Sequence, residues 1–330
     1  PGAVELGLRV DAPPSAEAAK DAEEALRDVL ILLRTRTGHD FRNYKRATVL
    51  RRLERRMQVH GVPNLPAYRA FLQANPEEAS ALLKDLLIGV TNFFRDPEAF
   101  ELLQRDVVPE VVEQAAQSPA GLRAWVAGCA TGEEAYSIAM LLCEQASLVA
   151  QPPKIHLFAT DIDEAAIGVA RLGCYPGAIE TDVSPTRLRR FFDKEGHQYR
   201  IRKEVREKVM FAAHNILRDP PFSRLDLISC RNLLIYLDRE VHGEILEMFH
   251  FALKPGGILV LGSSESADTA SQLFSVVDKK NRIFRANPVT RTPRYVPSLP
   301  TLGPSGTVAT PGEARPEKRG VSFAELHHRL

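Results

Sequence analysis

Two acidic residues open a helix directly after a turn of small residues. The stretch WVAGCATGEEAYSIAM, residues 125–140, reads as an apolar strand, a glycine-rich turn and a helix that begins at Glu133 and Glu134. Turns of this kind usually bind a phosphate at the positive N-terminus of the helix. Here carboxylates take that place, so the turn predicts a ligand that carries positive charge. Gly128 would let the backbone approach that ligand closely.

A further carboxylate ends the next apolar stretch. In ATDID, Asp161 has the position at which nucleotide-binding α/β proteins hold ribose hydroxyls. Carboxylates that converge on one crevice suit a ligand with a ribose, a positive charge and no phosphate, and S-adenosylmethionine has these groups. Plainer interpretations stay open. The glycines would then serve strand–helix packing, Glu133 would favour the helix dipole, and Asp161 would cap a helix, a role for which Asp163 is equally placed.

Alternating strands and helices must position these residues. Strands are predicted at 122–127, 154–159, 225–230, 258–262 and 282–286, and helices at 132–147, 163–172 and 238–253. This order is typical of a doubly wound, mostly parallel α/β sheet, which binds ligands at the carboxyl ends of its strands. One segment breaks the pattern, because QYRIRKEV and KVMFAAHN, within 198–213, predict an inserted antiparallel hairpin.

Helical periodicity and changes in composition along the sequence also predict where domains begin and end. Helices are predicted near 21–38, 41–60, 65–74 and 77–88, and another over 97–117. We therefore expect a linker over 1–20, a helical N-terminal domain over 21–90, an α/β domain over 91–287 with an inserted β subdomain at about 175–214, and a flexible tail over 288–330. The final VSFAELHHRL is compatible with the start of another helix, which suggests a fragment of a longer protein.

Composition excludes several classes of function. The 330 residues have a net charge of +1, so the chain offers no strong overall field for nucleic acid. Its 4 cysteines form no C-x-x-C pair and fit reduced thiols in the cytoplasm. No pair of histidines has metal-ligand spacing, and no run of about 18 apolar residues occurs. We expect a cytoplasmic protein that binds no metal or nucleic acid and does not insert into a membrane.

Longer motifs make a specific resemblance. TNFFRDP (91–97), AGCATGEEAYSIAM (127–140), ATDID (159–163), ISCRNLLIYLD (228–238) and LKPGGILVLGSSES (253–266) occur in this order. Together they resemble the CheR family, the chemotaxis-receptor glutamate O-methyltransferases, over about residues 22–286. TGHDFRNYKRATVLRRLERRM resembles the variants fused to other sensory domains. The resemblance implies a class I S-adenosylmethionine-dependent methyltransferase domain behind a small all-helical domain, as a monomeric part of a longer protein. LKPGG is expected to form a loop before its strand.

The resemblance implies roles for individual residues. Cofactor contacts would come from Thr91, Arg95, Glu133, Asp161, Asn215, Ile216, Arg231 and Asn232, in addition to Gly128. Glu133 would contact the α-ammonium of S-adenosylmethionine and Asp161 the ribose. Asn215 and Ile216 would border the adenine.

Two residues are expected to be catalytic. Arg95 would lie near the methionine carboxylate and the reacting centre, and Tyr236 close to the transferred methyl group. Plainer interpretations remain: Arg95 would pair with Asp96 at the surface, Tyr236 would belong to the core, and Arg231 with the residue after it would cap the following helix.

Basic residues on the second predicted helix suggest the substrate. Arg51, Arg52 and Arg55 lie opposite its apolar stripe and would complement the acidic methylation sites of a chemoreceptor helical bundle. A solvated helix face is the alternative. The region FDKEGHQYRIRKEV is short and lacks the additional glycine of family members that grip a receptor's C-terminal tail, so we expect no tail tether.

Other functions remain open at this stage. A non-catalytic module would bind S-adenosylmethionine or S-adenosylhomocysteine and dock on a receptor. A nicotinamide dehydrogenase is disfavoured, because G-x-G-x-x-G is absent. A glutamate substrate is ionised at neutral pH, with a pKa of about 4.3, so its methylation needs no general base. The lack of a Ser/His/Asp or Cys/His constellation agrees with such a substrate.

Overall fold

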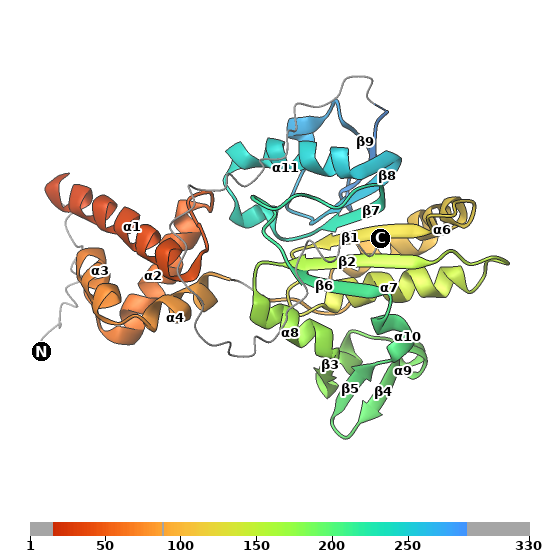
Figure 1. Ribbon diagram of the computed structural model, residues 1–330, viewed down its shortest axis with the longest axis horizontal. Helices are drawn as coiled ribbons and strands as arrows, with labels where there is room; N and C mark the ends of the chain where they lie inside the picture. Colours follow the sequence, from red (N-terminus) through yellow and green to blue (C-terminus); the bar gives the residue numbers. More distant parts are fainter. Residues whose placement is uncertain (1–15, 88, 289–330) are drawn as a thin grey trace, which may run out of the picture. The chain divides into compact units, whose positions relative to one another are not determined.

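The computed structural model describes residues 16–87 and 89–288, and the chain divides into two compact units on either side of residue 88 (Figure 1). Most of the linker predicted over 1–20, most of the tail predicted over 288–330 and the VSFAELHHRL segment lie outside the described residues. The predicted boundary between the domains, at 90/91, is close to the boundary that the contacts give.

The smaller unit is all-helical, as predicted. It consists of α1 (Ala16–Thr37), α2 (Arg46–His60), α3 (Leu65–Ala74) and α4 (Glu78–Leu86). Helix α1 therefore begins inside the range predicted as linker, and α2 begins later than the predicted 41. Gly61, with a left-handed φ of 62°, ends α2, as expected for a helix C-terminus. Apolar side chains from all of these helices meet in one core, including Val29, Leu53, Leu72 and Leu82.

The larger unit contains a seven-stranded sheet with the order β6-β2-β1-β7-β8-β10-β9. The strands are β1 (Leu122–Ala127), β2 (Ile155–Asp161), β6 (Val209–Ala213), β7 (Leu225–Cys230), β8 (Leu253–Leu261), β9 (Phe274–Asp278) and β10 (Ile283–Ala286). Strands β6, β2, β1, β7 and β8 are parallel, and β10 runs antiparallel to both of its neighbours. The mostly parallel α/β sheet is thereby confirmed. LKPGG, predicted as a loop, belongs to β8 instead.

Helices cover both faces of this sheet. They are α5 (Pro97–Leu102), a π-helical turn (Leu103–Val107), α6 (Val108–Ala116), α7 (Glu133–Ala146), α8 (Glu164–Leu172) and α11 (Arg239–Ala252). Trp125 of β1 packs edge-to-face on Phe249 of α11, with ring centroids 5.6 Å apart. Its neighbours Ala124 and Val126 join the core that contains α6 and α7. Side chains alternate across a strand, so α11 and α7 lie on opposite faces.

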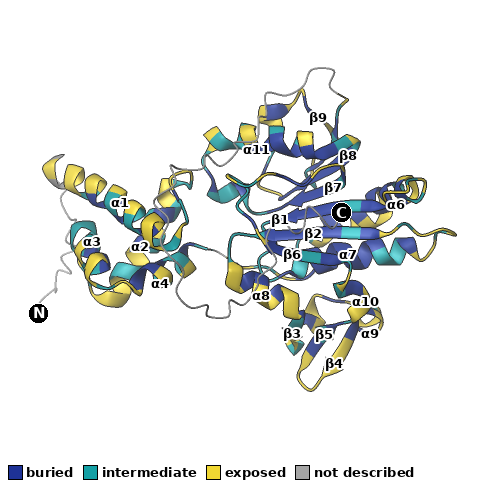
Figure 2. Cartoon of the chain, viewed as in Figure 1, coloured by how far each residue is buried: buried dark blue, intermediate teal, exposed yellow. Residues whose placement is uncertain are grey.

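The central strands are buried almost throughout, as Figure 2 shows for β1, β2 and β7. The chain leaves β1 and returns to β2 through α7, whereas it leaves β7 and returns to β8 through α11. Since these helices lie on opposite faces, the topology reverses between β1 and β7. Ligands of open α/β sheets bind at the carboxyl ends of the strands beside such a reversal.

An inserted unit separates α8 from β6. Its three-stranded antiparallel sheet has the order β3-β5-β4, with β3 (Cys174–Pro176), β4 (Phe192–Glu195) and β5 (Gln198–Ile201). A 3-10 turn (Gly177–Thr181) and the short helices α9 (Pro185–Phe191) and α10 (Lys203–Arg206) accompany it.

The hairpin predicted within 198–213 is wrong. QYRI forms β5 and pairs with β3 and β4, whereas VMFAA forms β6 and pairs in parallel with β2. Helix α10 separates the two segments. Val209, Phe211 and Ala212 are buried, and Val209 and Phe211 join the large core, which suits a strand of the parallel sheet. An antiparallel insertion is present, but it ends before β6.

Candidate functional site

The predicted site residues gather at one end of the parallel strands. Gly128 follows β1, Asp161 ends β2, Asn215 lies just beyond β6, and Arg231 follows β7. These strands are consecutive neighbours in the sheet. Their carboxyl ends therefore bring together side chains that are up to about a hundred residues apart, at the point where the topology reverses.

The turn between β1 and α7 is built on glycines. Gly128 and Gly132 have φ values of 75° and 96°, which L side chains rarely adopt. A Cβ on Gly132 would lie 2.9 Å from the Cβ of Ala170, and one on Gly128 would lie 3.1 Å from Cδ2 of Leu233. Close packing thus explains both glycines, as the plainer interpretation of this turn expects.

Asp161 fixes this turn. The Ala130 N–H donates to its Oδ2 at 2.8 Å, and the Asp163 N–H donates to its Oδ1 at 2.9 Å. Burial raises the pKa of the Asp161 carboxyl. The N-cap of α8 is Asp163, which accepts from the N–H groups of Ala165 and Ala166. The alternative in which Asp161 caps that helix is therefore set aside.

Glu133 is the first residue of α7 and is half-buried. The hydroxyl of Thr131 donates to its Oε2 at 2.7 Å, and burial raises the pKa of the Glu133 carboxyl. Within the described ranges, no basic side chain forms an ion pair with Glu133 or with Asp161. Half-buried carboxylates that lack a resident cation fit a ligand with a positive group and with hydroxyls, such as S-adenosylmethionine.

The next glutamate has a different environment. Oε1 of Glu134 accepts from the Ser229 hydroxyl at 2.7 Å, and Oε2 lies 3.4 Å from Nη1 of Arg231. The Arg231 side chain is only 1% exposed. Its Nη2 donates to Oδ2 of Asp96 and to the carbonyl of Arg95, both at 2.7 Å. Groups of the protein thus contact both Nη1 and Nη2 of this guanidinium. The predicted contact of Arg231 with the cofactor stays a prediction.

Both predicted catalytic residues lie on loops beside this region. Nη1 of Arg95 donates to the carbonyl of Val90 at 2.9 Å, whereas Asp96 pairs with Arg231, so the surface pair between Arg95 and Asp96 is not formed. Tyr236 ends a 3-10 turn, Leu234–Tyr236, and is half-buried rather than part of the core. Their catalytic roles stay predictions.

The remaining predicted cofactor residues are held by local turns. Asn215 Oδ1 accepts from the Leu217 N–H at 3.0 Å, and the Asn215 N–H donates to Oδ2 of Asp219 at 2.7 Å. Ile216 and Thr91 are half-exposed. These positions are compatible with the predicted contacts to the adenine and methionine parts of the cofactor. Those contacts stay predictions.

Glu265 is a residue that the sequence reasoning missed. It is 4% exposed, and its carboxylate accepts from the N–H groups of Gly262 at 2.6 Å, Asn232 at 3.0 Å and Ile235 at 3.2 Å. The carboxylate thereby fixes the loop after β7, in which Asn232 has a left-handed φ of 59°. The signal was a lone acid in the small-residue stretch GSSES, directly after a buried strand.

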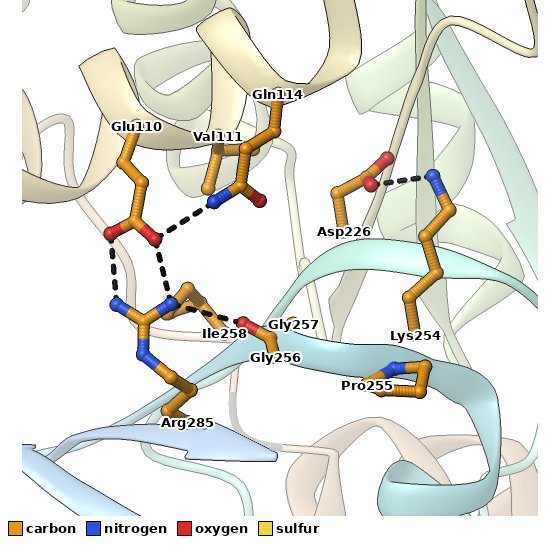
Figure 3. A pocket seen from close by; sticks show the side chains of 10 residues that line it. All are labelled: Glu110, Val111, Gln114, Asp226, Lys254, Pro255, Gly256, Gly257, Ile258 and Arg285. Carbon is orange, nitrogen blue, oxygen red and sulfur yellow. Dashed lines mark hydrogen bonds and ion pairs between the residues drawn. The ribbon is translucent and has the colours of Figure 1, made fainter. Parts of the chain in front are cut away.

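A small pocket lies at the other end of the strands (Figure 3). Its cavity of about 40 Å³ is lined by Glu110, Val111, Gln114, Asp226, Lys254, Pro255, Gly256, Gly257, Ile258 and Arg285. Asp226 and Lys254 are near the amino ends of β7 and β8 and pair at 2.6 Å, and Glu110 pairs with Arg285 at 2.7 Å. Each carboxylate here has its own cation, so this pocket does not suit a cationic ligand.

The predicted substrate residues lie on α2 in the smaller unit. Arg51 and Arg55 are exposed, and Arg52 is half-buried. The neighbouring Arg56 turns inward and pairs with the buried Glu78 at 2.6 Å. Over the described part of the chain, no helix has the length and apolar character needed to cross a membrane.

Comparisons with known proteins assign the family. Residues 89–283 match the CheR methyltransferase SAM-binding domain, and residues 24–87 match the CheR methyltransferase all-alpha domain. The two matches meet at the boundary between the structural units. S-adenosylmethionine is therefore the cofactor of the larger unit.

Several known proteins are similar in sequence to most of this chain. An uncharacterized 104.1 kDa protein in the hypE 3' region of Rhodobacter capsulatus is 43% identical over 80% of this chain, which spans only 28% of that protein. The putative methyltransferase Cher3 of Pseudomonas putida is 33% identical over 75% of this chain and 91% of its own length. The chemotaxis protein methyltransferase of Salmonella typhimurium is 32% identical over 76% of this chain and 86% of its own. The chain belongs to the CheR family of S-adenosylmethionine-dependent methyltransferases.

Proposed function

We propose that this chain methylates glutamate side chains of chemoreceptors in the cytoplasm and thereby acts in chemotactic adaptation. The observation that carries the proposal is the placement of Glu133 and Asp161 at the carboxyl ends of the central strands, as half-buried carboxylates without a cation partner among the described residues. The chemotaxis protein methyltransferases among the relatives support the signalling role.

The residues at hand fit a donor with a cationic amino-acid end and a ribose. Glu133 would hold the α-ammonium and Asp161 the ribose hydroxyls, because each offers a half-buried acceptor. When bound, S-adenosylmethionine supplies a sulfonium methyl group that a carboxylate oxygen can take up, giving a methyl ester and S-adenosylhomocysteine.

The work left to the protein is alignment and exclusion of water. A glutamate side chain is ionised at neutral pH, so no group has to remove a proton. Arg95 would orient the attacking carboxylate through its positive charge, and Tyr236 would line the path of the methyl group. Bulk water stabilises separated ions more than a transition state in which their charges cancel, so a dry site favours the reaction. Good orientation alone can lower the barrier by about 7–11 kcal/mol.

The acidic partner would be recognised by the smaller unit. Arg51 and Arg55 project from α2 into solvent, and charge complementarity with an acidic helical bundle would raise the rate of encounter. In the insert, only residues 196 and 197 separate β4 from β5. We propose that substrate capture proceeds without a tether to a receptor's C-terminal tail.

Transfer of a radiolabelled methyl group to purified receptor fragments tests the activity. We expect base-labile label on the wild-type fragment and none on a fragment whose methylation-site glutamates are replaced by glutamine. Binding of S-adenosylhomocysteine without any transfer would instead identify a non-catalytic docking module.

Charge reversal on α2 tests the recognition surface. The double variant R51E/R55E should raise KM for the receptor fragment and leave the affinity for S-adenosylhomocysteine unchanged. K20E, which reverses an exposed charge on α1, is the matched control. An unchanged KM in the double variant would refute this surface.

A further inference from the structure

The backbone on both sides of Arg95 has an unusual conformation. Phe94 and Asp96 have φ values of 51° and 59°, in the left-handed region that residues other than glycine rarely adopt. Such a backbone costs free energy and persists only where the surrounding structure holds it in place. Strain of this kind is concentrated at functional sites, and here it flanks the residue proposed to orient the substrate.

Contacts from α7 hold the first of these residues. The Phe94 N–H donates to the hydroxyl of Ser137 at 3.0 Å. The Phe94 ring packs edge-to-face on Phe100 at 5.4 Å, and the guanidinium of Arg187 lies 4.5 Å from its centre. Phe94 is thereby fixed, with 8% of its surface exposed.

Arg231 holds the other side. Its Nη2 donates to the carbonyl of Arg95 and to Oδ2 of Asp96, both at 2.7 Å. One guanidinium nitrogen thus engages the main chain of the proposed catalytic residue and the side chain of its strained neighbour. The same guanidinium lies 5.1 Å from the centre of the Phe100 ring.

The opposite end of this guanidinium reaches the first turn of α7, directly after the glycine-rich turn of residues 128–132, which we call the cofactor turn. Nη1 of Arg231 lies 3.4 Å from Oε2 of Glu134, whose neighbour Glu133 is the predicted ammonium ligand. Nε of Arg231 is buried and has no hydrogen-bond partner within the described residues. An arginine that is buried with an unsatisfied N–H is costly, so stability alone is a weak reason for its presence.

We propose that Arg231 is a positioning residue for methyl transfer: it fixes the main chain at Arg95 and Asp96 relative to the cofactor turn and does not bind the cofactor. This inference rests on the proposed role of Arg95. Because one rigid guanidinium joins the segment that orients the acceptor to the turn that seats the donor, it would keep the two in register for in-line attack.

Steady-state kinetics and calorimetry on R231K and R231M test the proposal. We expect kcat to fall by about 10²-fold in R231M, because a small misplacement of Arg95 is enough to cause such a loss. R231K should retain more activity, since an ammonium can replace one contact but not both. The Kd for S-adenosylhomocysteine should stay unchanged in both. A raised Kd with an unchanged kcat would make Arg231 a cofactor ligand and overturn the proposal.

Asp96, whose side chain is 42% exposed, provides a variant that keeps Arg231 itself. D96G relieves the left-handed strain but removes the carboxylate that pairs with the buried Arg231, so a purely structural role predicts altered stability and unchanged activity. The positioning role predicts a lower kcat with an unchanged KM for S-adenosylmethionine. R105M, which removes an exposed arginine paired with Asp106, is the control and should behave as the wild type.

Hydrogen exchange tests the positioning role of Arg231 independently of the proposed receptor substrate. The Phe94 amide should exchange faster in R231K and D96G than in the wild type, and this measurement needs no methyl acceptor. Unchanged exchange would refute the positioning role even if the wild type methylates receptors. Faster exchange with unchanged kcat would refute its catalytic relevance. A wild type that fails to methylate receptors would refute the proposed substrate, while the exchange data would still decide whether Arg231 holds the segment.

Discussion

The two ends of the parallel strands use carboxylates in opposite ways. At the carboxyl ends, Glu133 and Asp161 accept hydrogen bonds from hydroxyl and backbone donors, and burial raises the pKa of both. Around the pocket at the amino ends, Glu110 pairs with Arg285, which lowers the pKa of Glu110. Asp226 pairs with Lys254 in the same pocket.

The difference favours the carboxyl ends of the strands as the ligand-binding end. A carboxylate with its own cation is already neutralised and contributes mainly to the fold. A buried carboxylate without one gains most when a positive group arrives from outside. Perturbed carboxyl groups in a crevice are accordingly better indicators of a site than a pocket lined with completed ion pairs.

Among variants at the two ends of the strands, substitution of Arg95 should cause the largest loss of activity. R95A removes the cation that we assign to the attacking carboxylate, so kcat/KM for a receptor fragment should fall by about 10²-fold or more. R285A, at the other end of the strands, should leave kcat/KM near the wild-type value. Normal turnover in R95A, measured by methyl transfer under saturating conditions, would remove Arg95 from the mechanism.

Removing the charge of Glu133 should weaken cofactor binding. E133Q leaves the ammonium without its anion, and loss of such a partner costs about 2 kcal/mol or more. The Kd for S-adenosylhomocysteine should rise roughly thirtyfold, as measured by calorimetry. E110Q is the matched control at the amino ends and should not change that Kd. Equal Kd values for E133Q and the wild type would contradict the assignment of the ammonium site.

The pH dependence of ligand affinity should distinguish the carboxylates at the carboxyl ends of the strands from those at the amino ends, without any mutation. The pKa values of Glu133 and Asp161 are raised from 4.5 and 3.8, so these groups take up protons at a higher pH than ordinary carboxyl groups. Ionised Glu133 attracts the cofactor's ammonium, and ionised Asp161 accepts hydrogen bonds from the ribose hydroxyls more strongly than its protonated form. Affinity for S-adenosylhomocysteine should therefore be complete near neutral pH and decline as the pH falls, beginning above the ordinary carboxyl range.

The same titration has an internal control. In E133Q the decline should be smaller, because one of the responsible groups no longer titrates. Glu110, with its lowered pKa, stays ionised over this range and contributes nothing to the decline. A Kd that is independent of pH in the wild type would mean that neither half-buried carboxylate meets the ligand.

The smallest effect should come from the pairs of the opposite pocket. Arg285 and Glu110 are each about one third exposed, so R285M should lower the free energy of unfolding by about 1 kcal/mol or less. Thermal denaturation measures this change, and calorimetry should show unchanged affinity for S-adenosylhomocysteine. A large loss of affinity would mean that the two ends are coupled.

Much of the fold could be predicted from the sequence. Strands β1 and β7 have the predicted bounds, because their apolar runs end abruptly at a glycine and at Arg231. Helix termini followed from strong local signals such as Gly61 and Pro97. The hairpin within 198–213 failed because both segments have strand character, and local pattern does not say which partner a strand takes. Strand β9 was missed because it is short and mostly exposed.

The site could be predicted in part. Glu133 and Asp161 were recognised because both follow an apolar strand. The link between Asp96 and Arg231 joins residues 135 positions apart, and no spacing rule connects them. Glu265 was overlooked for a related reason, since its partners are backbone N–H groups that any sequence would supply. A contact to a main-chain group does not require a particular type of partner residue, so the sequence does not reveal it.

Several contacts attach the insert to the rest of the larger unit, among them those of Tyr175. Tyr175 of β3 donates its hydroxyl to the carbonyl of Thr131 and packs edge-to-face on Phe93, whereas the turn between β4 and β5 is exposed. Changes in length at that distal turn would leave the attachment intact. A fluorophore or an affinity peptide introduced beside Gly196 would therefore report on this enzyme while leaving its chemistry undisturbed.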